Sequence, residues 1–135
     1  MPRSSIEVAN AFLKLAHDQG TTLDQMQLQE LVYIAQGSFL AMHGKVLTGD
    51  SPEARAYGHE YPRLAESLAS HGAAPLDQLI GAADNLDAGA SPAAPGYFTG
   101  VEQDLIARVL SDYDGLTSVQ MATLTRGPGS PWEQI

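Results

Sequence analysis

Repeated start signals for α-helices constrain this fold more than any other feature of the sequence. In a capping box, a Ser or Thr side chain accepts a hydrogen bond from the backbone N–H three residues on, and a Glu or Gln there accepts one in return. The chain carries this pattern at Ser4 with Glu7, Thr22 with Gln25, Thr99 with Glu102, Thr117 with Gln120, and Ser130 with Glu133. Apolar residues at helical spacing or the chain end follow each of them, so the sequence predicts a mainly α fold.

The apolar periodicity sets the expected helices and identifies a central one. Helices are predicted over about 5–19, 23–43, 62–70, 100–114 and 118–126, with a last one from 131 to the end. Within 23–43, a rotation of about 100° per residue separates two apolar stripes. One stripe holds Leu28, Leu31, Val32, Ala35, Phe39 and Met42, and the other holds Met26, Tyr33 and Leu40. Burial on two sides predicts a central helix ended by Gly44, while the helix at 5–19, ended by Gly20, is expected on the outside.

The 135 residues suit one domain. We expect residues 1–135 to form a compact single domain of about six helices around the buried helix 23–43. A short β-hairpin or extended segment is expected near 45–61, because a turn-forming run separates Val46 and Leu47 from Ala54–Gly58. Residues 73–99 are rich in Pro, Gly and Ala, which predicts a loop inside the domain, where Leu76, Leu79 and Ile80 could form one helical turn.

The net charge of the chain limits the classes of molecule that it is expected to bind. Sixteen acidic against 7 basic side chains give a formal net charge of −9, and no Lys or Arg lies between Arg63 and Arg108. This charge predicts that the chain does not bind nucleic acid directly, and the helix region after Thr117 carries only Arg126. An acidic face can steer a basic protein or imitate nucleic acid, and it can also serve solubility alone.

Residue types that carry catalysis or bind metals are present without the spacing that their chemistry needs. His43 and His71 each precede a glycine that ends a predicted helix, where the helix dipole favours an imidazolium. His59 and Glu60 resemble part of a zinc-protease helix, but Arg63 stands where the second His would be needed. The carboxylate pairs Asp112 with Asp114 and Asp84 with Asp87 are expected to be solvated caps. We therefore predict no enzyme activity, no cofactor and no metal, with a small hydrolase using His59 and Glu60 as an alternative.

The cellular compartment of the protein is predicted from features that are missing from the sequence. It has no cysteine, no apolar run of membrane-spanning length, and no basic segment followed by an apolar one at its start. We expect a cytoplasmic protein without membrane association, and the sequence leaves its oligomeric state open.

Three separated segments of the chain resemble the Panacea domain, also known as the SocA-like or GepA-like domain. The segment Leu23–Gly37 is similar to the family pattern Leu-x-x-x-Lys-Leu-Gln-Lys-Leu-Leu-Tyr-x-x-Gln-Gly. Ala54–Gly58 with Pro62 resembles Ala-Trp-x-Tyr-Gly-Pro-Val-x-Pro, and Leu124–Arg126 with Ser130–Trp132 resembles the Leu-Thr-His and Pro-Trp ending. The chain departs from the pattern at Gln27 in place of Lys, Arg55 in place of Trp, and His59-Glu60 in place of Pro-Val.

The resemblance implies a compact helical antitoxin domain of bacteria or their phages, which neutralises a toxin protein by direct binding without catalysis. Some relatives are also adaptors for an ATP-dependent protease. For such a domain we predict a partner-binding patch of Tyr57, Gly58, His59, Glu60, Tyr61 and Arg63, because an extended segment between helices offers backbone groups and side chains together. Two alternatives stay open: Tyr57 and Gly58 only seat a turn on the core, or the chain is an acidic phage or mobile-element inhibitor of a host defence or DNA-handling complex.

Overall fold

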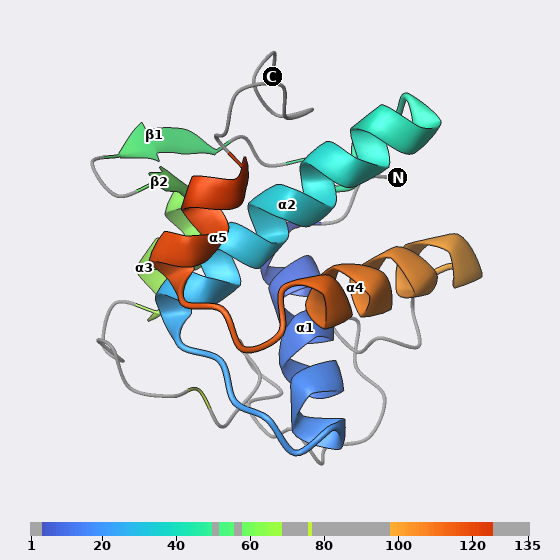
Figure 1. Ribbon diagram of the computed structural model, residues 1–135. Coiled ribbons are helices and arrows are strands. Elements are labelled where there is room, and N and C mark those ends of the chain that lie inside the picture. Colours follow the sequence, from blue (N-terminus) through green and yellow to red (C-terminus); the bar gives the residue numbers. More distant parts are fainter. Residues whose placement is uncertain (1–3, 50–51, 56–57, 69–75, 77–97, 126–135) are drawn as a thin grey trace.

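The structure is a computed structural model that describes residues 4–49, 52–55, 58–68, 76 and 98–125. It is mainly helical, as the sequence predicts (Figure 1). The helices are α1 (Ser5–Asp18), α2 (Gln25–His43), α3 (Pro62–Leu68), α4 (Gly100–Asp112) and α5 (Ser118–Thr125). Strands β1 (Glu53–Arg55) and β2 (Gly58–Glu60) pair antiparallel between α2 and α3.

The predicted capping boxes are confirmed at Ser4, Thr99 and Thr117. At Ser4, for example, the backbone N–H donates to the Glu7 carboxylate at 3.0 Å, and the Glu7 N–H donates to the Ser4 hydroxyl at 3.1 Å. The corresponding pairs Thr99 with Glu102 and Thr117 with Gln120 form the same two bonds. The box predicted at Ser130 lies outside the described residues.

The box predicted at Thr22 is wrong, because α2 begins later. Asp24 is the N-cap, and its N–H donates to the Gln27 side chain at 2.9 Å while the Gln27 N–H donates to the Asp24 carboxylate at 2.8 Å. The preceding residue is extended: the carbonyl of Leu23 accepts a hydrogen bond from the Leu76 N–H at 2.8 Å, as an antiparallel bridge. This long-range pairing delays the first helical turn.

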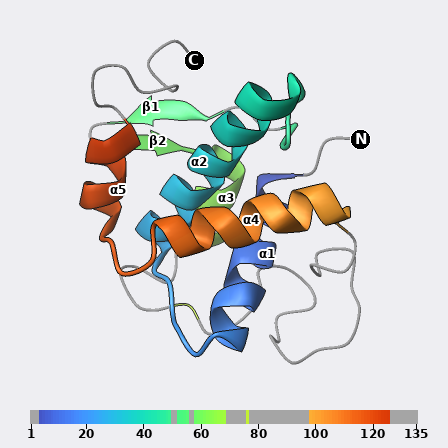
Figure 2. The same cartoon turned by 45° about the vertical axis from the view of Figure 1, so that its right-hand side comes forward.

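Helix α2 runs through the middle of the molecule, with the β1–β2 pair on one side and α4 on another (Figures 1 and 2). It packs against α1, α3, α4, α5 and β2. Every residue from Leu28 to Ala35 is buried, so the expected two-sided burial holds for this part of the helix. Met26 and Met42, predicted on the apolar stripes, are 44% and 57% exposed because they lie outside this covered stretch. Gly44 ends α2 in the left-handed conformation with φ 66°, as the sequence predicts.

Helix α1 is not the outer helix that its apolar pattern suggested. Every residue from Val8 to Leu13 is buried, which covers all sides of the helix, because α2, α3 and α4 all pack against it. Only its C-terminal end, including His17 and Asp18, is exposed.

Several sequence predictions fall outside the described residues. These are the helix from 131 to the end, His71 and most of the loop 73–99. Leu76, described within that loop, is buried and bridged to Leu23, so it does not form the helical turn considered for it; Leu79 and Ile80 are not described.

Candidate functional site

The predicted contact patch lies at the passage from β2 into α3. Glu60 ends β2 and is half-buried, while Arg63 is exposed in the first turn of α3. Gly58 and His59 form the rest of β2, and Tyr57 lies outside the described residues. Among the patch residues whose burial is described, Glu60 and Arg63 have side chains that reach the surface.

Tyr61 corrects the predicted patch, because its side chain is 0% exposed. It is among the largest fully buried side chains and belongs to the hydrophobic core with Leu64 and Leu68 of α3. An aromatic residue beside a turn has the composition of a contact residue, but here its ring fills the core. Tyr61 is thus a structural residue.

The backbone of Tyr61 is held by a glutamine of the central helix. The Tyr61 N–H donates to Gln29 Oε1 at 2.8 Å, and Gln29 Nε2 donates to the Tyr61 carbonyl at 3.3 Å. Gln29 is 5% exposed, so both bonds are shielded from water. Shielded hydrogen bonds are costly to break without replacement. This contact fixes the start of α3, and with it the end of β2, to α2.

The strand pairing gathers negative charge next to this fixed point. In the register of β1 and β2, Glu53 lies directly opposite Glu60. Directly opposed residues project from the same face, with Cβ atoms about 5 Å apart, and like charges there disfavour the pairing. We refer to Glu53 and Glu60 as the acidic strand pair.

Two further glutamines of α2 hold neighbouring loops in the same way. Gln36 Oε1 accepts hydrogen bonds from the N–H groups of Leu47 and Thr48 at 2.8 and 2.9 Å. Gln27 Nε2 donates to the carbonyl of Leu116 at 3.0 Å. Sequence reasoning missed these roles, although amide side chains between apolar positions of a buried helix signal a need for internal partners. Gln27, Gln29 and Gln36 of α2 therefore have structural roles.

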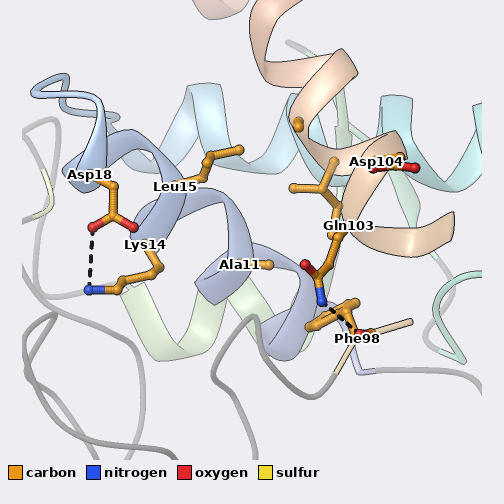
Figure 3. Close-up of a pocket in the computed structure, with 9 residues that line it drawn as sticks. Ala11, Lys14, Leu15, Asp18, Phe98, Gln103 and Asp104 are labelled. Carbon is orange, nitrogen blue, oxygen red and sulfur yellow. Dashed lines mark hydrogen bonds and ion pairs between the residues drawn. The ribbon is translucent and has the colours of Figure 1, made fainter. Parts of the chain in front are cut away.

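The surface also contains hollows between helices. One, of about 240 Å³, lies between α1 and α4 (Figure 3). Lys14 and Asp18 form an ion pair of 3.4 Å in its lining, and Gln103 Nε2 donates to the Phe98 carbonyl at 2.8 Å. The rest of the lining is mainly apolar, and it does not bring a nucleophile together with a base.

A second hollow, of about 230 Å³, includes Tyr113 at the end of α4. Burial raises the pKa of Tyr113 above its ordinary value of 10.0, and the charge of the neighbouring Asp112 raises it further. Both effects favour the neutral phenol, which has no role as a base near neutral pH.

The described residues offer no metal site, since none of their His, Asp and Glu side chains gather in a group of three or more that could hold an ion. His43 lies in the last turn of α2, where its ring contacts Phe39 with centroids 4.8 Å apart. In the part of the chain that is described, the helices are too short or too polar to cross a membrane.

Comparisons of the chain with models of protein families, with curated proteins and with solved structures find no match.

Proposed function

We propose that the chain is a protein-binding domain of the antitoxin type, which neutralises a partner protein by direct contact. The observation that supports this proposal most is the acidic strand pair, Glu53 opposite Glu60, on a segment anchored to the central helix by Gln29. Gln29 holds the Tyr61 backbone next to Glu60, which lowers the ordering that binding at this end of β2 would require. Ordering is one of the main costs of association. A net charge of −9 favours a basic partner.

The proposed contact surface consists of the acidic strand pair and Arg63, together with Tyr57, Gly58 and His59 from the sequence prediction. We infer that the whole chain, residues 1–135, is one Panacea-like domain of about six helices around α2. On this proposal the chain acts without catalysis or a cofactor, and it makes no direct contact with nucleic acid. Delivery of the bound partner to a protease is a further role that the resemblance suggests.

Co-expression tests the proposal. The tagged full chain is produced together with each protein encoded beside it and analysed by size-exclusion chromatography. We expect a stoichiometric complex with one of them. The proposal fails if the chain elutes alone in every combination.

A charge-reversed pair of variants locates the contact. Glu53→Lys with Glu60→Lys keeps two like charges opposite each other but reverses their sign, and we expect it to weaken the complex at least ~10-fold. The matched control is Asp18→Lys at the C-terminal end of α1, far from the strands in both views (Figures 1 and 2). It changes one charge in the same direction and should leave binding within ~3-fold of the original. Equal binding by the strand variant would contradict the assigned surface.

The salt dependence of the complex separates this proposal from nucleic-acid imitation. The basis of the alternative is the interval from Arg63 to Arg108, which lacks Lys and Arg. A surface that replaces many phosphates would lose affinity steeply between low and moderate salt. A contact centred on the acidic strand pair should show only a shallow dependence.

A further inference from the structure

We propose that two copies of this chain associate through α4, with Asp104 of each copy paired to Arg108 of the other. This inference does not rest on the proposed function, since it concerns another surface and the chain alone.

The outward face of α4 carries charges of both signs in a fixed order. At 3.6 residues per turn, Val101, Asp104, Arg108 and Asp112 fall within an arc of about 80°. All four side chains are exposed. Within the described residues, neither Asp104 nor Arg108 takes part in an ion pair, although they lie four positions apart on one helix. Both charges are therefore available to a partner.

Exposed apolar side chains lie beside these charges. A hollow of about 210 Å³ separates the last turn of α2 from the first turns of α4, and Met42, Val101, Asp104 and Arg108 are among its lining. The side chains of Met42 and Val101 are 57% and 52% exposed. The C-terminal end of α2 and the N-terminal end of α4 lie on the same side of the molecule (Figures 1 and 2). Methionine adapts its shape to a partner surface, so this hollow can receive a side chain from another molecule.

The order of charges identifies the second molecule as another copy. A twofold axis between Asp104 and Arg108 makes two α4 helices antiparallel and brings each carboxylate to the other copy's guanidinium. Such an interface is self-complementary, because the same residues meet in exchanged roles. A uniformly basic partner would satisfy Asp104 but would meet Arg108 in the same hollow. The local balance of charge thus favours self-association, in contrast to the acidic strand pair.

The net charge of −9 on each copy opposes association over long distances. At an ionic strength of about 0.15 M the Debye length is about 8 Å, so charges far from the interface interact weakly. Contacts within the interface are screened less. We therefore expect the dimer at physiological salt.

Sedimentation of the purified full chain over a micromolar to submillimolar range tests the proposal. We expect a reversible monomer–dimer equilibrium. Arg108→Asp places carboxylates opposite each other twice, and Asp104→Arg does the same with guanidinium groups, so each should weaken dimerisation at least ~10-fold. The double variant Asp104→Arg with Arg108→Asp exchanges the charges and should restore the original constant within ~3-fold.

A second matched pair of variants tests the ends of the interface. In the antiparallel arrangement Val101 lies opposite Ser111 and near Asp112 of the other copy, so Val101→Glu should weaken the dimer by placing two carboxylates together. Val119→Glu on α5, 68% exposed in the original chain, should not weaken it. Thermal unfolding of each variant confirms that it is folded. A wild-type chain that remains monomeric throughout overturns the proposal. So does a dimer that tolerates both single charge reversals, or one that the exchanged double variant does not restore.

Discussion

Gln29 and Tyr61 are joined by two buried hydrogen bonds, from the Tyr61 N–H to Gln29 Oε1 and from Gln29 Nε2 to the Tyr61 carbonyl. The two residues are 32 positions apart, and both bonds connect one side chain to one backbone unit. A single amide side chain of α2 therefore holds the backbone at the passage from β2 into α3.

We expect Gln29→Ala to lower the free energy of unfolding by about 2–4 kcal/mol, because two buried backbone groups lose their partners. Urea unfolding followed by circular dichroism measures this change. The matched control is Gln120→Ala, which removes an exposed glutamine that also accepts from a backbone N–H, that of Thr117. Water can replace that bond, so the control should cost less than about 1 kcal/mol. Equal losses in the two variants would show that burial of the Gln29 contact is unimportant.

Gln36→Ala should act locally. The N–H groups of Leu47 and Thr48 both donate to Gln36 Oε1, so their amide hydrogens should exchange roughly 10–100-fold faster in the variant. Amides in the middle of α1, such as that of Phe12, provide the internal reference. If the Leu47 and Thr48 amides keep their protection while α1 also stays unchanged, Gln36 does not hold this loop.

The start of α2 can be tested by two substitutions two residues apart. Asp24→Ala should destabilise the protein by about 1 kcal/mol, because Asp24 is the N-cap and bonds the Gln27 N–H. Thr22→Ala should stay within about 0.5 kcal/mol of the original, since Thr22 is exposed and precedes the cap. Thermal or urea unfolding decides between the two starts, and a larger loss at Thr22 would restore the cap predicted from the sequence.

The titration of Tyr113 should depend on its neighbour. Its pKa is raised above 10.0, first by burial and then by the charge of Asp112. Asp112→Asn should therefore lower the pKa toward 10.0 without reaching it, as followed by the ring resonances of Tyr113 in an NMR titration. Asp104→Asn is the control, and it should leave the titration unchanged. If the Asp112→Asn variant keeps the Tyr113 pKa of the original chain, the electrostatic contribution is contradicted.

The same shift has a consequence for stability at high pH. Because the folded state favours the neutral phenol, the unfolded chain loses this proton first as the pH rises. The contribution of Tyr113 to stability is complete below pH 10 and is lost as the pH rises through the raised pKa of the folded protein. Tyr113→Phe should remove this part of the alkaline decline. An unchanged slope of stability against pH above 10 would argue against it.

The fold was predictable wherever local signals agreed with the packing. Ser4, Thr99 and Thr117 lie beside helices whose first turns satisfy their own backbone groups, and such caps depend on a few adjacent residues. Thr22 misled because the pairing of Leu23 with Leu76 determines where α2 begins, and no local pattern contains that contact. The prediction that α1 lies on the outside was wrong for a related reason. Its small residues Ala9 and Ala11 allow neighbouring helices to pack closely, and the apolar periodicity of α1 alone does not indicate this.

For the predicted patch, the sequence indicated an extended segment before α3 but did not indicate which of its side chains are exposed. Glu60 and Arg63 have exposed or half-exposed side chains where the sequence placed the patch, whereas Tyr61 is in the core. An extended aromatic residue has the same local sequence whether its ring faces inward or outward, and here the Gln29 contact from a distant helix accompanies the inward orientation. The pairing of Glu53 with Glu60 likewise depends on strand register, which composition does not specify.

Neutralisation by direct binding is tested most directly in cells. Each gene beside this one is expressed alone and with the full chain, and colony formation is counted. We predict that one neighbour stops growth, that the original chain and Asp18→Lys restore it, and that Glu53→Lys with Glu60→Lys does not. Neutralisation by direct binding is contradicted if no neighbouring gene stops growth. It is also contradicted if Glu53→Lys with Glu60→Lys restores growth as well as the original chain does.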